Sequence, residues 1–299
     1  MQIQMFNSWY FFWIILLSAI TAGLYFLLKN KSPKIQDTVL FSLLLIGLVL
    51  HFLKIYIPPY SENESLMLRE IWFVNICGAN IGLFPFLFLS KNKMAREYMV
   101  YFGIISGFLA IVYPVEPIEK ANQLAEQLDI IRFYYHHWML MAVPLLMVML
   151  KRHKPSYRRI LTAPTGLLVV MLFIILNQLF QSELGFVPLR NDSNFFDINY
   201  RNNSYIWGPK DNDTIGRLFA TFTPEIFKTV PVGEFADQAK YWPWFWMIIP
   251  VYVIITPLAF IIALIFDGKS IATDSKRLLR RVRRFVRRRF LNPIKKHNA

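Results

Sequence analysis

A single cysteine and a few polar residues stand inside apolar segments, where they could do chemistry. Cys77 is the only cysteine of the 299-residue chain and lies in the stretch IWFVNICGAN, residues 71–80. A neighbouring imidazole could take the thiol proton and make the sulfur a nucleophile for covalent catalysis. Without such a base, a buried cysteine acts as a small apolar side chain. A catalytic role and a packing role are therefore both open for Cys77.

The cysteine content and the histidine positions bear on metals and cofactors. One cysteine excludes an intramolecular disulfide and a cysteine-based zinc site. A zinc site formed by His51, His136 and His137 is an alternative, but adjacent histidines on a helix point about 100° apart and bind one metal poorly. The chain has no glycine-rich phosphate loop and no nucleotide motif. We therefore expect no metal and no cofactor.

The segments that carry these residues are long and apolar. Hydrophobic residues make up 55% of the chain, and the mean hydropathy is +0.37. About 20 apolar residues are needed to cross a bilayer as a helix, and a membrane helix satisfies its backbone hydrogen bonds internally. These lengths predict an all-α, polytopic membrane helix bundle with seven transmembrane helices. The predicted spans are 9–28, 38–57, 71–89, 98–113, 133–150, 160–180 and 242–266.

Charge in the connecting segments predicts the orientation of the spans. The segments 29–37, 90–97 and 151–159, together with the residues from 267 onward, hold 23 of the 33 Lys and Arg residues. The alternate segments hold 15 of the 19 acidic residues. Because Lys and Arg mark cytoplasmic loops, we expect the N-terminus outside and the C-terminus inside.

The chain divides into a membrane domain and a basic tail. Residues 1–267 form the predicted seven-helix domain, which includes an extracytoplasmic loop at 181–241, and residues 268–299 form the tail. Apolar residues recur at helical spacing in the tail, which predicts a cationic amphipathic helix on the cytoplasmic membrane surface. We expect anionic lipid headgroups, and no nucleic acid, as its partners. The arginines expected to contact these lipids are Arg280, Arg281, Arg284, Arg287 and Arg288.

Four spans each bring a polar residue to a similar depth. At 1.5 Å per helical residue, these residues lie about 5–9 Å below the outer boundary. They are Cys77, His137, His51 and Asn177, with Asn75 and Asn80 one turn either side of that level. Polar side chains in a membrane usually face the bundle interior or a wet cavity. We therefore predict a shared polar chamber that opens to the outer side.

Within this chamber, Cys77 and His137 are the residues suited to covalent chemistry. His137 would act as general base, and an oxyanion would need N–H donors. The candidates for orienting the imidazole are Asn75, Asn80, Asn177 and His51, and His136 has a supporting or interfacial role. Asparagine and glycine in spans also serve helix packing, which remains open for these residues. A sulfur nucleophile in the acyl region of a membrane suggests an acyl chain as the transferred group.

The order of several motifs resembles a known membrane protein family. They are HFLK (51–54), the cysteine-bearing segment that begins VNICGAN (74–80), RFYYHHWMLMAVP (132–144), Asn177, SYIWGPK (204–210) and WPWFW (242–246). Over about residues 38–266 the chain is similar to the YwaF-like bacterial membrane proteins, which are related to the eukaryotic transmembrane protein 164 group. The resemblance implies acyl transfer between lipids, with Cys77 as nucleophile and His137 as base. The chain differs from the family pattern in Asn75, where a histidine is frequent, and in its longer outer loop and basic tail.

The leading hypothesis is a multi-pass lipid acyltransferase or transacylase of a bacterial plasma membrane that acts on phospholipid acyl chains from the outer leaflet. An alcohol, an amine or a lysolipid would accept the acyl group. Two alternatives use the same bundle without catalysis. One is a protein that binds or transports a lipid or small solute, and the other is a structural subunit of a membrane or envelope complex.

Overall fold

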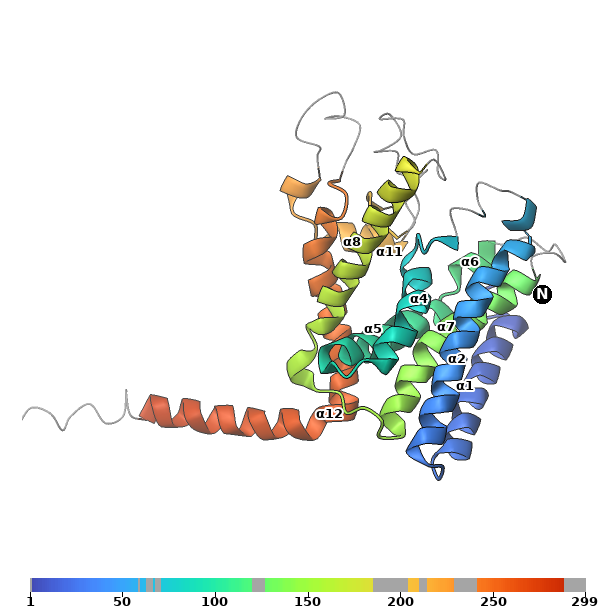
Figure 1. Ribbon diagram of the computed structural model, residues 1–299. Coiled ribbons are helices and arrows are strands. Elements are labelled where there is room, and N and C mark those ends of the chain that lie inside the picture. Colours follow the sequence, from blue (N-terminus) through green and yellow to red (C-terminus); the bar gives the residue numbers. More distant parts are fainter. Residues whose placement is uncertain are drawn as a thin grey trace, which may run out of the picture.

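A computed structural model describes residues 2–58, 60–62, 67, 71–119, 127–184, 204–209, 214–228 and 241–287. Within these ranges every regular element is helical, and no strand occurs. The expected all-α architecture is confirmed. The α-helices, with the labels of Figure 1, are α1 (Ser8–Leu28), α2 (Pro33–Leu53), α4 (Ile76–Leu89), α5 (Lys93–Val112), α6 (Val115–Glu119), α7 (Gln127–Met149), α8 (Thr162–Glu183), α11 (Thr214–Ala220) and α12 (Ile248–Val286).

Each of the seven predicted spans contains one main helix, but the helices differ in how well their length and composition suit a membrane. Five described helical segments are long and apolar enough to cross a bilayer, namely those containing α1, α2, α5, α8 and α12. The apolar helix α4 has 14 residues, which reach about 21 Å at 1.5 Å each, less than a hydrocarbon core of about 30 Å. Helix α7 has 23 residues but begins with the polar run QLDIIR. The chain is a multi-pass membrane protein, and seven spans remain a prediction.

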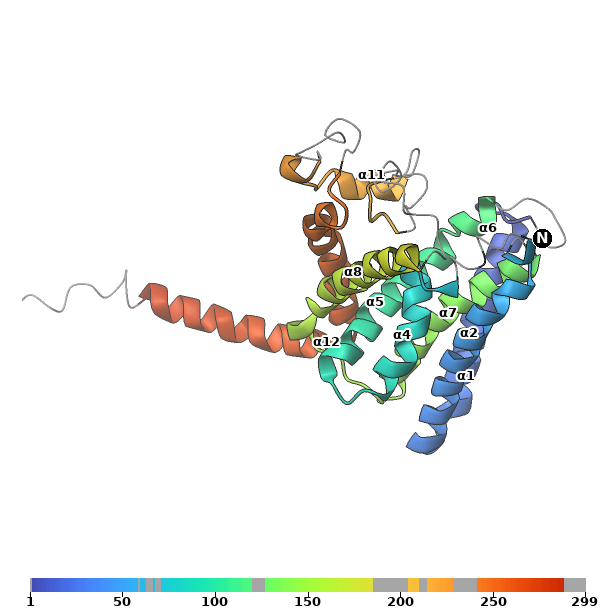
Figure 2. The ribbon, with the colours of Figure 1, turned by 45° about the horizontal axis from the view of Figure 1, so that its top comes forward.

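Helix α7 lies inside the bundle, which explains why it tolerates polar residues. Figures 1 and 2 show it running beside α1, α2 and α5. On its α1 side the Tyr134 ring stacks on Trp13 at 4.5 Å, and Trp138 donates a hydrogen bond to Thr21 (2.8 Å). On its α2 side Tyr135 donates to the carbonyl of Leu43 (2.9 Å). A helix enclosed by neighbours faces little lipid, so its polar groups find protein partners.

Helices α5 and α7 make the most extensive helix–helix contact of the bundle. Two glycines in the sequence GIISG, Gly103 and Gly107, face α7. A Cβ atom at Gly103 would lie 2.6 Å from the carbonyl oxygen of Leu140, and one at Gly107 would collide with the carbonyl oxygen of His137. Small residues four apart let membrane helices approach closely. This close approach sets the position of the α7 segment that carries His137.

The third predicted span differs from its helix at the outer end. The prediction placed a continuous helix from residue 71, whereas α4 begins at Ile76 after a non-helical turn at 72–75. Phe73 has φ 60°, which is in the left-handed region of backbone conformation. A right-handed α-helix needs a negative φ, so the helix cannot run through this residue. Asn75 then caps the helix through its side chain, which accepts the N–H of Gly78 (2.6 Å). Cys77 is therefore the second residue of α4 rather than a mid-helix residue.

The last helix bends where the predicted tail begins. Asp267 has φ −131° and ψ 20° inside α12, and beyond it the helix turns away from the bundle (Figure 1). The Asp267 carboxylate accepts the backbone N–H of Tyr157 (3.0 Å), which ties the bend to the segment that precedes α8. Apolar residues of the outgoing segment are uncovered within the described chain, namely Leu278, Leu279, Val282, Phe285 and Val286. Of the predicted lipid-contacting arginines, Arg288 lies outside the described residues.

Candidate functional site

The structure brings Cys77 and His137 into direct contact. The Nε2 atom of His137 lies 3.1 Å from the Sγ atom of Cys77, which is within hydrogen-bonding distance for sulfur. The two residues are 60 positions apart in sequence and come from α4 and α7. His137 is buried, whereas Cys77 is only partly buried. A nucleophile and a base are therefore adjacent, and the cysteine residue retains some accessible surface.

The second nitrogen of His137 determines which tautomer faces the sulfur. His137 Nδ1 lies 2.8 Å from the carbonyl oxygen of Phe133, one turn earlier in α7. A carbonyl oxygen can only accept, so Nδ1 carries the hydrogen and Nε2 presents its lone pair to Cys77. The thiol S–H therefore donates to Nε2, which is the arrangement a general base requires.

The group that orients His137 is a backbone carbonyl, not one of the side chains predicted from the sequence. The described contacts of its ring are with Phe133 and Cys77. The predicted orienting residues hold the backbone around the start of α4 instead. A carbonyl one helical turn away is present at every helical histidine, so no residue type in the sequence identifies it.

The first turn of α4 leaves one N–H group unused beside the sulfur. The first four N–H groups of a helix have no partner within the helix. Here the Ile76 N–H donates to the Ser204 hydroxyl (2.9 Å), the Gly78 N–H to Asn75 Oδ1 (2.6 Å) and the Ala79 N–H to the Asn75 carbonyl (2.9 Å). Within the described part of the chain, the N–H of Cys77 has no hydrogen-bond acceptor. It is thus available for a ligand atom at the positive end of the helix dipole.

The other asparagines hold the surrounding backbone in place. Asn80 donates to the carbonyl of Ile76 (2.8 Å) and accepts the hydroxyl of Tyr98 from α5 (2.8 Å). Asn177 on α8 donates to the carbonyl of Trp72, in the turn before α4. These bonds tie the start of α4 to α5 and α8. The contacts of both asparagines are therefore with backbone carbonyls and with Tyr98.

The two remaining histidines contact backbone as well. His51 Nε2 lies 3.2 Å from the carbonyl of Ile71, and its ring stacks on Phe73 at 4.7 Å. His136 uses both nitrogens, because Nδ1 accepts from Arg132 (3.1 Å) and Nε2 donates to the carbonyl of Gly47 (3.0 Å). Within the described part of the chain, neither ring is hydrogen-bonded to the sulfur of Cys77. No group of three histidine, cysteine or acidic residues in the described ranges is arranged to hold a metal ion.

Three contributors to this site were not found from the sequence. They are Phe73, whose left-handed backbone forms the turn, Ser204, which accepts the first N–H of α4, and the glycine pair of α5. The glycine pair had a readable signal, because GIISG is a small-xxx-small pattern in an apolar segment. Ser204 stands in the segment SYIWGPK but carries no signal for a bond to α4. The turn at Phe73 has none either, because phenylalanine rarely adopts this conformation.

Comparison with known proteins places the chain in a family. No curated protein and no solved structure matches the chain significantly. The profile of the TMEM164 family matches residues 4–209, which is more than half of the chain and includes Cys77 and His137. The chain belongs to the TMEM164 family.

Proposed function

We propose that the protein is a cysteine-dependent lipid acyltransferase in which Cys77 carries the acyl group and His137 moves the proton. The observation that supports the proposal most directly is the 3.1 Å contact between Sγ and a His137 Nε2 that presents its lone pair. A thiol that only packs has no need of an oriented base, whereas covalent catalysis needs one within hydrogen-bonding reach.

In the first half-reaction, His137 Nε2 takes the thiol proton as Sγ attacks the carbonyl carbon of a phospholipid ester. The C–S bond forms, and negative charge develops on the former carbonyl oxygen. When the intermediate collapses, the ester C–O bond breaks and the His137 imidazolium gives its proton to the departing lysolipid oxygen, which becomes a hydroxyl. The acyl chain is then a thioester on Cys77.

The second half-reaction reverses these proton movements. An acceptor hydroxyl or amine loses its proton to His137 Nε2 while attacking the thioester carbonyl. The C–S bond breaks, and Sγ regains the proton. The unused N–H of Cys77 would donate to the carbonyl oxygen in both steps, and preorganised donors of this kind are worth about 10²–10³ in rate.

The membrane setting of the proposed reaction follows from the charge distribution. We infer an outer N-terminus and an inner C-terminus, which places Cys77 toward the outer leaflet of a plasma membrane, proposed to be bacterial. The segment of α12 beyond Asp267 would lie on the inner surface with its uncovered apolar face in the lipid. Its arginines would contact anionic headgroups.

The test is an acyl-transfer assay with the full-length protein in vesicles of phosphatidylcholine that carries isotope-labelled acyl chains. A lysophospholipid serves as acceptor, and labelled product is measured by mass spectrometry. Cys77→Ala should abolish transfer, and Cys77→Ser should retain only a trace. Full activity of Cys77→Ala would exclude the nucleophile role and favour the alternative of a lipid-binding protein without chemistry.

A further inference from the structure

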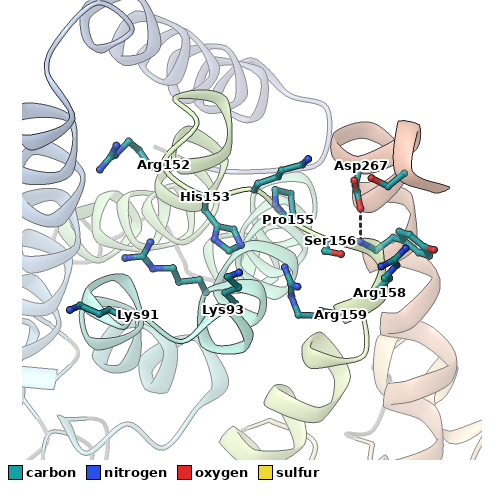
Figure 3. Close-up of a pocket in the computed structure, with 13 residues that line it drawn as sticks. Lys91, Lys93, Arg152, His153, Pro155, Ser156, Arg158, Arg159 and Asp267 are labelled. Atoms are coloured by element: carbon teal, nitrogen blue, oxygen red, sulfur yellow. Dashed lines mark hydrogen bonds between the residues drawn. The ribbon is translucent and has the colours of Figure 1, made fainter. Parts of the chain in front are cut away.

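A cationic pocket lies at the end of the bundle opposite Cys77, where α4 meets α5 and α7 meets α8. Its volume is about 500 Å³, within the range of small-molecule sites. Basic side chains come from the α4–α5 connection and from residues 152–159, as Figure 3 shows. A pocket of this charge attracts an anion.

The arginines of the pocket are already engaged by protein groups. Arg152 binds both carboxylate oxygens of Asp37 (2.7 and 2.5 Å), and Arg159 binds Glu97 (2.5 Å). The remaining two, Arg158 and Arg96, bind Asp274 and the carbonyl of Ser90 respectively. These contacts hold the walls of the pocket in place.

Three lysines of the pocket have no acidic partner among the described residues. Lys91, Lys93 and Lys154 are exposed and line the pocket, and none makes an ion pair there. Four acidic residues contact the pocket walls, namely Asp37, Glu97, Asp267 and Asp274, against seven Lys and Arg side chains in its lining. The pocket therefore has an excess of three positive charges with histidine neutral.

Buried His153 adds a further unused polar group. Its side chain is 6% exposed, and its Nε2 atom makes no hydrogen bond, although it lies 3.6 Å from the Glu97 carboxylate. Buried polar atoms normally have a partner. His153 lines the pocket (Figure 3), and its Nε2 atom is enclosed beside Glu97, so the ring forms part of the pocket wall.

An apolar groove continues from the cationic pocket along the membrane face of the bundle. The groove has a volume of about 490 Å³, and Arg158 and Arg159 line both it and the pocket. Its walls come from α4, α5 and α8, with aliphatic side chains such as Leu83, Leu87, Met94 and Val169. A positively charged pocket joined to an apolar groove matches a ligand with an anionic head and a hydrocarbon chain.

We propose that the pocket and groove together bind one anionic phospholipid, with its phosphate among Lys91, Lys93 and Lys154 and one acyl chain in the groove. Basic pockets between helices on the cytoplasmic side are suited to such headgroups. The site is separate from Cys77 and from the tail arginines, and it does not rest on the proposed acyl transfer. The excess of three charges favours a phosphomonoester headgroup over a singly charged one.

The test measures binding of fluorescent phosphatidic acid to the full-length protein in non-ionic detergent. The first variant combines Lys91→Gln, Lys93→Gln and Lys154→Gln, which are exposed positions. The matched control combines Lys29→Gln, Lys31→Gln and Lys34→Gln, which removes the same charge from exposed positions around the α1–α2 connection, outside the pocket and the groove. The lysine variant should bind on the order of 100-fold more weakly, whereas the control should stay within about threefold of the unmodified protein. Equal losses in the two variants, or no loss in the lysine variant, would overturn the proposal.

Two further arms distinguish a lipid from a free anion. Inorganic phosphate should compete only at concentrations far above those of phosphatidic acid, because it cannot fill the groove. Val169→Trp, at an exposed groove position, should weaken lipid binding and leave competition by phosphate unchanged. If phosphate or an oligonucleotide competed as well as the lipid, the site would not be a phospholipid site.

Discussion

Gly107 of α5 lies directly against the backbone carbonyl of His137, and this contact sets how close the imidazole comes to Cys77. A Cβ atom at Gly107 would collide with that oxygen and with the backbone nitrogen and Cβ of Met141. The sulfur–imidazole distance of 3.1 Å therefore depends on a glycine in a third helix. Catalytic geometry is sensitive to shifts of about 1 Å, so the glycine is a positioning residue.

Gly107→Ala should impair both stability and the cysteine–histidine pair. Overpacking a close helix contact typically costs about 1–3 kcal/mol, and the required shift of α7 would move His137 from the sulfur. The thermal unfolding midpoint and the rate of Cys77 labelling by a lipid-like electrophile should both fall. Gly23→Ala is the matched control, because no atom lies within 4 Å of a Cβ there. A labelling rate unchanged by Gly107→Ala would show that the helix contact does not position the pair.

His137→Gln should slow labelling of Cys77 by the same electrophile. A positioned general base raises the reaction rate by about 10²–10⁴-fold, and a glutamine side chain cannot take the thiol proton. The control is His136→Gln, the adjacent histidine whose nitrogens bind Arg132 and the Gly47 carbonyl. Labelling in that variant should stay close to the original rate. Equal rates in both variants and the unmodified protein would mean that the thiol is not activated.

The proximity of Cys77 and His137 could be predicted from the sequence, but their detailed arrangement could not. Span direction and helical rise were enough to place both residues near one depth. The helix of the third span was predicted to begin at residue 71, because Ile71, Trp72 and Phe73 read as membrane residues. The left-handed backbone at Phe73 ends that continuity, and its cause is tertiary, since the ring packs on His51 and over Gly82.

The basic loops predict an orientation in the membrane, but their charges alone do not predict the pocket that they form. For Lys91, Lys93 and Lys154 the sequence predicts only the side of the membrane on which their charges lie. They line one pocket because the start of α5 lies near the segment that follows α7, and a count of charges does not show this. The arginines also pair with acidic residues that are distant from them in sequence, as Arg152 does with Asp37. Sequence alone does not predict these ion pairs.

Asn75→Ala should loosen the start of α4. Loss of an N-cap side chain costs about 1 kcal/mol, and here it also frees the Gly78 N–H beside the sulfur. Asn75→Asp keeps an accepting oxygen and should retain most of the stability. Thermal unfolding and hydrogen exchange of residues 76–80 measure the effect. Equal behaviour of the two variants would show that the cap is not what holds this turn.

The orientation can be checked with single cysteines in a Cys77→Ser background. Tyr56 is 74% exposed at the end of the second predicted span, and Lys31 is exposed in the α1–α2 connection that precedes this span. Tyr56→Cys should react with a membrane-impermeant maleimide added to intact cells, and Lys31→Cys should react only after permeabilisation. The reverse pattern would invert the proposed topology and place Cys77 toward the inner leaflet.

The most direct test of the central claim is detection of the acyl group on Cys77. The reconstituted protein is incubated with phospholipid in the absence of an acceptor, quenched in acid and analysed by intact and peptide mass spectrometry. The account predicts one acyl chain on the peptide that contains Cys77, released by neutral hydroxylamine and formed far more slowly in His137→Gln. Acyl transfer at the full rate with Cys77 unmodified, or by Cys77→Ala, would contradict it.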